Sequence, residues 1–383
     1  MITGIKSDKI ITPDGLFDGY IYFSEEKILS VTAQELPCDR LLDYTGKYVT
    51  PGFIDMHVHG GNGADFCKAD PEKVAVAADF HLRHGTTTIL PTVTSVTFEA
   101  MCQAMENIRT CMAEGLQQAN IAGVHLEGPY FSPYQCGAQN PDKLTAPIKA
   151  EYTTLLEQHG DLIKRWSYAP ELDKDSEFVR TLCQYNVIPS VGHSNAIYPE
   201  CLTAYENGCK LATHLYSSMS TITREGGYRR LGVIESAYLF DEMDVEIIAD
   251  GKHLPPELIR LICKCKGYDR VSLVTDAMQV AGTTATESEI GGVPCIIEDG
   301  VAKLLNRTAF AGSVATADRL LRVCVKDVGI AVTDAVRMLT ENPARILGIN
   351  AGKLIAGYRP DIAVFDDNIQ ITAVFVGGKP VTL

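Results

Sequence analysis

Six side chains in the sequence could together bind a metal ion and use it for catalysis. Each follows a short apolar run, and they are His57, His59, Glu127, His193, His214 and Asp276. Imidazoles and carboxylates suit Zn²⁺, Fe²⁺ or Co²⁺ without any thiolate. Taken alone, each residue is more typical of an ordinary hydrogen-bonded histidine or of a helix N-cap. Their common place at the ends of successive runs favours one shared site.

The spacing of the first two histidines supports a shared site. His57 and His59 stand two positions apart. Because residues i and i+2 of a strand point to the same face, both imidazoles can approach one ion. By the same alternation, His125 faces the side of Glu127 but lies one layer deeper.

A metal held by three or four protein ligands with one open position is typical of a catalytic site. Such an ion lowers the pKa of its water to about 7 and polarises a carbonyl group. Asp276, beside that water, can take its proton and pass it to a leaving amine. The set therefore predicts metal-dependent hydrolysis of an amide, with Asp276 as the catalytic carboxylate.

Eight short apolar runs must position these side chains. They span residues 53–59, 87–93, 121–127, 163–169, 187–193, 210–214, 245–250 and 271–276, and helix-like patterns fill most of the gaps, as at 71–84, 98–114 and 177–185. Eight β–α alternations indicate a parallel (β/α)8 TIM barrel of the α/β class. An open doubly wound sheet would alternate in a similar way, but the polar residues gather at the run ends, where a barrel builds its active site.

Both ends of the chain have the pattern of short strands separated by turns. Residues 10–12, 20–23 and 27–31 are strand-like near the N-terminus, as are residues 361–365 and 372–376 near the C-terminus. Neither end could form a stable sheet alone. We therefore predict one discontinuous β-domain from residues 1–50 and 351–383, beside a metal-dependent barrel domain of residues 51–350.

The composition limits the classes of binding partner and the cellular compartment that we expect. The formal net charge of −14 argues against nucleic acid or an anionic membrane surface, because both bind basic faces. It leaves room for an anionic small substrate held by a few local cations. The twelve cysteines are scattered, which indicates thiols in a reducing compartment. With no apolar leader and no apolar run of membrane-spanning length, we expect a cytoplasmic enzyme.

The ordered motifs resemble a known family. The segment PGFIDMHVHG at 51–60 resembles the opening barrel motif of the amidohydrolase superfamily. The later segments resemble the N-acetylglucosamine-6-phosphate deacetylase family: HLEGP at 125–129, GHS at 192–194, ATHL at 212–215, DGKH at 250–253, LVTDA at 273–277, AGS at 311–313 and NPAR at 342–345. The resemblance covers essentially the whole chain.

This resemblance implies a (β/α)8 barrel with a small β-sandwich domain formed by both chain ends. It implies that Glu127, His193 and His214 bind the main metal. A second metal would lie at His57 and His59, with Glu127 able to bridge the two. The subunit would then hold one or two divalent ions, Zn²⁺ or Fe²⁺, and the sequence leaves their identity and number open.

The resemblance also implies the role of Asp276 as general base and then general acid. Related superfamily branches use a carbamylated lysine at the end of strand four. Here that run ends Tyr168-Ala169-Pro170-Glu171 without a lysine, which favours the deacetylase branch.

Substrate contacts are implied at Gln139, Arg224 and His253, which match family positions that hold the sugar and its phosphate. The neighbouring Arg229 and Arg230 leave the choice of arginine open. The resemblance further implies a homodimer, in which one of these arginines could reach the partner's site.

One motif departs from the family pattern. Where the family usually has Asn-Ala after the strand-six histidine, this chain has Ser217-Ser218, so an amide donor is missing while the backbone N–H of Ser218 survives. The resemblance implies hydrolysis of N-acetylglucosamine 6-phosphate to glucosamine 6-phosphate and acetate, and the departure leaves other substrates open. The alternatives are N-acetylgalactosamine 6-phosphate, an unphosphorylated N-acetyl sugar or an N-acyl amino acid.

Two further points stay open in the sequence. A non-catalytic binding protein on a decayed barrel is a third class of function, and the complete ligand set argues against it. The segment 283–303, rich in Gly, Thr and Glu, could be a β-hairpin flap over the site or a plain surface hairpin.

Overall fold

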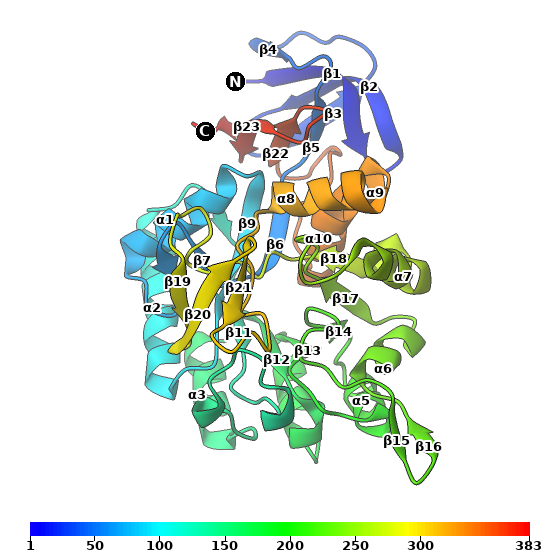
Figure 1. Ribbon diagram of the computed structural model, residues 1–383. Helices are drawn as coiled ribbons and strands as arrows, with labels where there is room; N and C mark the ends of the chain where they lie inside the picture. The colour runs from blue at the N-terminus through cyan, green and yellow to red at the C-terminus, as the bar shows by residue number, and fades with distance from the viewer.

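A computed structural model describes the chain from residue 1 to residue 383. Its centre is a ring of parallel strands (Figure 1). The strands are β6 (Phe53–Val58), β9 (Thr86–Val93), β11 (Val124–Glu127), β12 (Ile163–Tyr168), β13 (Ile188–Val191), β14 (Leu211–Ala212), β17 (Asp244–Ile247) and β18 (Val271–Leu273). Each strand pairs in parallel with the next one along the chain. The eight predicted runs are thus confirmed as the strands of the barrel.

The ring closes just beyond the ends of its first and last strands. The Asp276 amide donates to the His57 carbonyl at 2.9 Å, and the amides of His59 and Gly60 donate to the Ala277 carbonyl at 2.8 and 3.0 Å. These bonds join the segment after β18 to the end of β6. They therefore hold two of the predicted ligands against the predicted catalytic carboxylate.

Helices surround the barrel (Figure 1). They are α1 (Pro71–Leu82), α2 (Phe98–Glu114), α3 (Lys149–His159), α4 (Glu177–Gln184), α5 (Tyr198–Glu206), α6 (Val233–Leu239), α7 (Pro256–Lys266), α8 (Ala317–Arg322), α9 (Val332–Leu339) and α10 (Glu341–Leu347). Five short single-turn or wide-turn helices connect them: η1 (Pro133–Gln135), η2 (Pro141–Lys143), η3 (Pro170–Leu172), η4 (Tyr268–Arg270) and the π-helix η5 (Val323–Val328). None of these helices is both long enough and apolar enough to span a bilayer.

Helix α2 shows how the sequence sets these boundaries. Its first turn is capped by the Thr97 side chain, which accepts a hydrogen bond from the Ala100 amide. It ends at Gly115, whose φ of 63° is the left-handed conformation that glycine adopts without strain. Its buried residues recur at intervals of three and four, so one face packs on the barrel; they are Met101, Ala104, Met105, Ile108 and Cys111.

Both chain ends contribute to one eight-stranded sheet, as predicted (Figure 1). Its strands are β1 (Thr3–Thr12), β2 (Gly15–Phe23), β3 (Ile28–Thr32), β4 (Arg40–Asp43), β5 (Tyr48–Pro51), β22 (Ile362–Phe365), β23 (Ile371–Val376) and β24 (Lys379–Pro380). The C-terminal β22 pairs antiparallel with the N-terminal β5. Strand β1 pairs with β4 along its first half and with β5 along its second. The sheet encloses its own apolar cluster, which includes Ile5, Ile21, Phe23, Val364 and Phe375. The exact domain boundaries at 50 and 351 stay a prediction.

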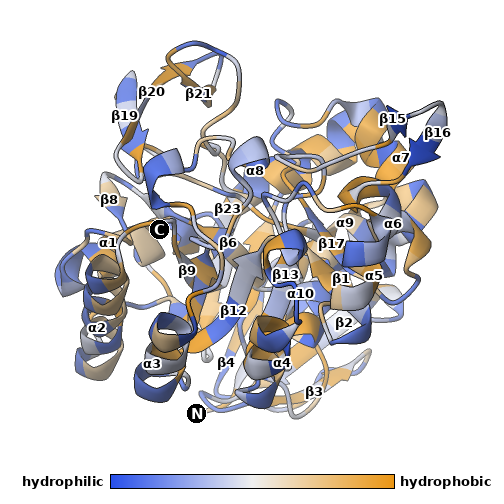
Figure 2. Cartoon of the chain, turned by 90° about the horizontal axis from the view of Figure 1, so that it is seen from below, coloured by the Kyte–Doolittle hydropathy of each residue, from blue (hydrophilic) through white to orange (hydrophobic).

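Several shorter strands accompany the eight strands of the barrel. Strand β10 (Asn120–Ile121) pairs with β9, and β7 (Gly60–Gly61) forms a short hairpin with β8 (Ala64–Asp65). A second hairpin, β15 (Thr223–Glu225) and β16 (Tyr228–Arg230), is exposed along its whole length. Figure 2 shows this hairpin as a hydrophilic element at the edge of the molecule.

The segment 283–303 forms more than a hairpin. Strands β19 (Glu287–Ile290), β20 (Val293–Glu298) and β21 (Val301–Leu304) make a three-stranded antiparallel sheet. It packs on the barrel mouth through a small apolar cluster that includes Met278, Val280, Ile290, Cys295 and Ala311. Because Ile290 also lines the central cavity, this sheet is a wall of the candidate site rather than a plain surface hairpin.

Candidate metal centre

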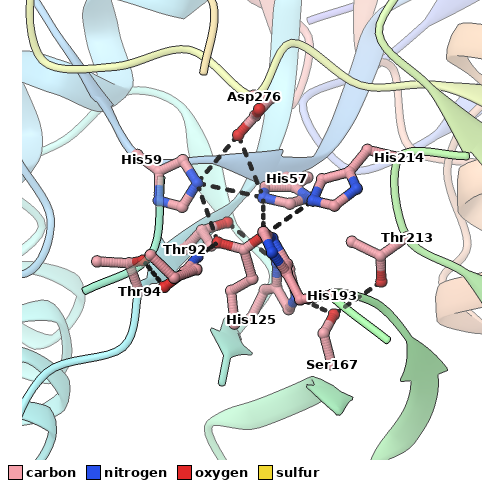
Figure 3. Close-up of polar contacts among 12 residues, drawn as sticks. His57, His59, Thr92, Thr94, His125, Ser167, His193, Thr213, His214 and Asp276 are labelled. Atoms are coloured by element: carbon pink, nitrogen blue, oxygen red, sulfur yellow. Dashed lines mark hydrogen bonds and ion pairs between the residues drawn. The ribbon is translucent and has the colours of Figure 1, made fainter. Parts of the chain in front are cut away.

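Two histidines and an aspartate meet where the ring of strands closes (Figure 3). The Nε2 atoms of His57 and His59 lie 3.2 Å apart. Asp276 Oδ1 is 3.0 Å from His59 Nε2 and 3.4 Å from His57 Nε2. All three side chains are buried. The first and last strands of the barrel therefore bring three potential ligand atoms to one point.

Glu127 connects this group to the histidines of strands five and six. Its Oε1 lies 3.2 Å from His193 Nε2 and 3.1 Å from His214 Nε2. Its Oε2 lies 3.4 Å from His59 Nε2. One carboxylate oxygen thus faces His193 and His214, and also His57 at 3.4 Å, while the other faces His59, so Glu127 would be shared if two ions were bound.

The donor set fits a divalent cation. The ligand atoms of His57, Glu127 and His214 lie within 4.8 Å of one another, as do those of His57, His59 and Asp276. Buried carboxylates require a compensating positive charge. Imidazole nitrogens that face one another cannot all be paired through shared protons, so some of them keep a free lone pair. His193 adds a further sign, because its Nδ1 donates to the Gln135 carbonyl at 3.0 Å and leaves Nε2 as the acceptor.

The electrostatics of the cluster favour negative carboxylates. Burial alone would raise the pKa of Glu127, but His57, His193 and His214 lower it well below its usual range. Burial likewise opposes ionisation of Asp276, but His57 and His59 lower the pKa of that carboxyl. Two buried anionic carboxylates beside several imidazoles are typical of a site built to receive a cation.

The backbone at the site adopts uncommon conformations. Residues with positive φ include His193 (44°), His214 (29°), Tyr216 (81°), Ser218 (51°) and Asp276 (49°). Non-glycine residues rarely adopt this region, and such strain concentrates at functional sites. Here it turns the chain sharply at the strand ends, so that the side chains point at one another.

A cavity of about 250 Å³ opens above these ligands. Four of the five predicted substrate residues line it, namely Gln139, Ser217, Ser218 and His253, together with apolar residues such as Phe310. Their convergence with the ligands in one cavity supports the predicted grouping, while their roles as substrate contacts stay a prediction.

Two of these residues are held by hydrogen bonds. Gln139 Nε2 donates to Glu127 Oε2 at 2.7 Å, while its Oε1 accepts from the Thr94 hydroxyl at 2.8 Å. His253 Nδ1 bonds to Asp250 Oδ2 at 2.9 Å, and its ring packs against Phe310 with centroids 4.8 Å apart. Gln139 is therefore fixed against the candidate ligand Glu127, and His253 is fixed with its Nε2 side free.

The fifth predicted residue, Arg224, does not line the cavity. It lies on the exposed β15–β16 hairpin with Arg229 and Arg230. No lysine or arginine is among the cavity's lining residues. Within one subunit, the cavity therefore offers no lysine or arginine to pair with a phosphate group.

A buried polar layer that the sequence pattern did not reveal lies beneath the candidate ligands. Its charged members are Arg165 on β12 and Glu246 on β17, both fully buried. His125 belongs to the same layer, one step below Glu127 as expected, with its Nε2 2.8 Å from the Ser167 hydroxyl. The signal was available, because a charged residue inside an otherwise buried strand is unusual and requires a partner.

Comparison with known proteins agrees with this site. The sequence model of the amidohydrolase family matches residues 48–381. The N-acetylglucosamine-6-phosphate deacetylase of Lysinibacillus sphaericus is 30% identical over 339 residues, 88% of this chain and 86% of that protein. The N-acetylgalactosamine-6-phosphate deacetylase of Escherichia coli O157:H7 is 26% identical and covers 98% of both chains.

A solved structure is similar over the full length. It is a mutant N-acetyl-D-glucosamine-6-phosphate deacetylase of Mycobacterium smegmatis in complex with N-acetyl-D-glucosamine-6-phosphate, with a TM-score of 0.92, 30% identity and coverage of 100% of both chains. The fold and the family resemblance predicted from the sequence are thereby confirmed. The chain belongs to the amidohydrolase family and, within it, to the family of the N-acetylglucosamine-6-phosphate deacetylases.

Proposed function

We propose that the protein is a metal-dependent deacetylase that hydrolyses the N-acetyl amide of N-acetylglucosamine 6-phosphate, releasing glucosamine 6-phosphate and acetate. The observation that carries this proposal is the convergence of four imidazoles on two buried carboxylates at the floor of one cavity. The relatives and the solved structure support the choice of substrate.

The ligands divide into two groups. His193, His214 and Glu127 would hold one ion, and His57 and His59 would hold a second that Glu127 and Asp276 also approach. Zn²⁺ and Fe²⁺ both suit this set. When bound, the metal supplies Lewis acidity that polarises the amide carbonyl and lowers the pKa of the attacking water.

Asp276 moves the proton. Its Oδ1 stands beside the Nε2 atoms of His57 and His59, at the floor of the cavity. The carboxylate accepts a proton from the water as the water oxygen bonds to the carbonyl carbon. It then donates that proton to the amide nitrogen as the C–N bond breaks, so that acetate and a free amine leave. Backbone bonds on both sides hold the residue for this task, from its own amide to His57 and from the Ser313 amide to its carbonyl.

Gly312 gives the substrate room beside this carboxylate. Its φ is 79°, a conformation suited to glycine, and a Cβ atom there would lie 3.0 Å from the Asp276 carbonyl oxygen and 3.7 Å from its Oδ2. A side chain at this position would therefore press on the backbone of Asp276 and would touch its carboxylate.

We further propose a homodimer whose exposed hairpin supplies the phosphate-binding cation. The cavity has no lysine or arginine of its own, and β15–β16 carries the exposed residues Arg224, Arg229 and Arg230. Subunit mixing tests this idea. Arg224→Ala subunits mixed with inactive Asp276→Asn subunits should regain activity if the arginine acts across the dimer, and should stay at the sum of the separate activities if it does not.

The cytoplasm is the compartment we propose. All twelve cysteines are free thiols, and most of them are buried. Unpaired thiols in this number are typical of a reducing compartment.

A second candidate substrate class is favoured by the same cavity. An uncharged N-acetyl sugar or another N-acyl compound would need no cation, and Ser217-Ser218 offers hydroxyls in place of an amide. The deciding experiment compares acetate release from N-acetylglucosamine 6-phosphate, its galactosamine epimer and the unphosphorylated sugars. Our proposal expects the first to give the highest kcat/KM. A higher value for any unphosphorylated sugar would contradict it.

A further inference from the structure

Directly beneath the metal centre lies a buried ion pair that the proposed reaction does not use. Arg165 on β12 and Glu246 on β17 are both 0% exposed, and two parallel hydrogen bonds join the guanidinium to the carboxylate, with Nη2 2.7 Å from Oε2. Desolvation offsets most of the attraction in such a pair, so its presence is weak evidence for stability. Its location points to a role at the ligands above it.

Every donor of Arg165 is occupied. Nε donates to Ser190 Oγ at 3.0 Å, Nη1 to the Met56 carbonyl at 3.3 Å and to Glu246, and Nη2 to Thr213 Oγ1 at 2.9 Å and to Glu246. A guanidinium has five N–H groups and no acceptor, so these bonds fix its plane. The fixed guanidinium in turn fixes the Glu246 carboxylate between the strands that carry the histidines.

The carboxylate faces the rear nitrogen of one ligand. Glu246 Oε2 lies 3.7 Å from His57 Nδ1 and 3.4 Å from the backbone amide of His214. His57 Nδ1 is buried and forms no hydrogen bond, while Nε2 of the same ring faces Glu127 and Asp276. A bound metal would offset the negative charges of Glu127 and Asp276 beside Nε2. The negative charge of Glu246 beside Nδ1 then favours the tautomer that carries its proton there and leaves the Nε2 lone pair for the metal.

We propose that Glu246, held by Arg165, is a positioning residue that keeps His57 in its metal-binding tautomer. The inference rests on the proposed metal-dependent function. Its effect should fall on the half of the centre formed by His57 and His59, because Glu246 contacts the other half only at the backbone amide of His214, whereas His193 has its own rear partner in the Gln135 carbonyl. A purely structural pair would affect both halves alike.

The test measures stepwise metal affinity by chelator competition with Zn²⁺, and ions per subunit by native mass spectrometry. The His59→Ala variant is measured first, to identify which metal-binding step belongs to the half of the centre formed by His57 and His59. In Glu246→Gln that step should weaken by about 10- to 100-fold, as is typical when the partner behind a metal-binding histidine is lost. The step of the other half should stay within a factor of about three of wild type. Ser190→Ala is the matched control, because it removes one bond of Arg165 without touching Glu246, and both steps should stay unchanged.

Two more variants guard against a failure to fold. Arg165→Gln/Glu246→Gln removes both charges together and leaves none unpaired, and Glu246→Asp keeps the ion pair while withdrawing the carboxylate from His57. Each folded variant should weaken the same step. Wild-type affinities at both steps in any folded Glu246 variant would overturn the inference. A wild-type protein that binds no metal at all would instead overturn the proposed function.

Discussion

Replacing Asp276 by asparagine should remove the proton transfer and leave the site in place. The two side chains have nearly the same shape, and the amide of residue 276 still donates to His57. An asparagine cannot accept the proton of the water, and positioned acid–base groups contribute about 10²- to 10⁴-fold to rate. We therefore expect kcat to fall by that factor, which corresponds to about 3 to 5 kcal/mol of activation free energy.

The assay follows acetate release by metal-loaded enzyme, with metal content measured on the same sample. Five ligands remain in Asp276→Asn, so the protein should still bind metal through Glu127 and the histidines. Asp161→Asn is the matched control, because that aspartate pairs with Arg109 at the surface and should give wild-type kcat. A folded, metal-loaded Asp276→Asn enzyme with unchanged kcat would refute the role of this residue.

Three further predictions concern stability. Burial lowers the pKa of His81 to about 4, below its ordinary 6.5, so the unfolded state binds the extra proton first and stability falls as the pH drops from 6.5 to 4. At pH 4.5 this loss is about 2 to 3 kcal/mol, and urea denaturation should show a smaller loss in His81→Gln. An equal loss in both would exclude His81 as the cause. Trp166→Ala should destabilise by about 3 to 5 kcal/mol, because Trp166 is fully buried and donates to the Gly128 carbonyl at 2.8 Å, whereas Trp166→Phe should lose less. Removing metal with a chelator should lower Tm, since an ion at 100 times its Kd stabilises by about 2.7 kcal/mol; an unchanged Tm would mean that no ion is bound.

Much of the barrel could be predicted because its strands are buried on both faces. Each strand therefore appears in the sequence as an apolar run. The length of the run reflects burial rather than the number of residues that pair with neighbouring strands. Helix α2 was predicted to the residue, since Thr97 and Gly115 mark its ends by their own chemistry. The run 210–214 was too long by comparison, because only Leu211–Ala212 pair as a strand before the chain turns at His214 with φ of 29°.

The convergence of the six candidate ligands could be predicted for the same reason. A histidine or carboxylate directly after a buried barrel strand lies at the mouth of the barrel, at the C-terminal ends of the strands. Arg165 and Glu246 could not be paired from the sequence, because they lie 81 residues apart and meet only through the barrel interior. The third strand of the β19–β21 sheet was also missed, since its pairing depends on packing against residues such as Met278.

The most direct test of the account is the metal dependence of acetate release from N-acetylglucosamine 6-phosphate. Protein stripped by chelation should release almost no acetate, and addition of Zn²⁺ or Fe²⁺ should restore turnover in step with ions bound per subunit. Full turnover by metal-free protein would contradict the account, as would a fully metal-loaded enzyme that cleaves no N-acetyl sugar.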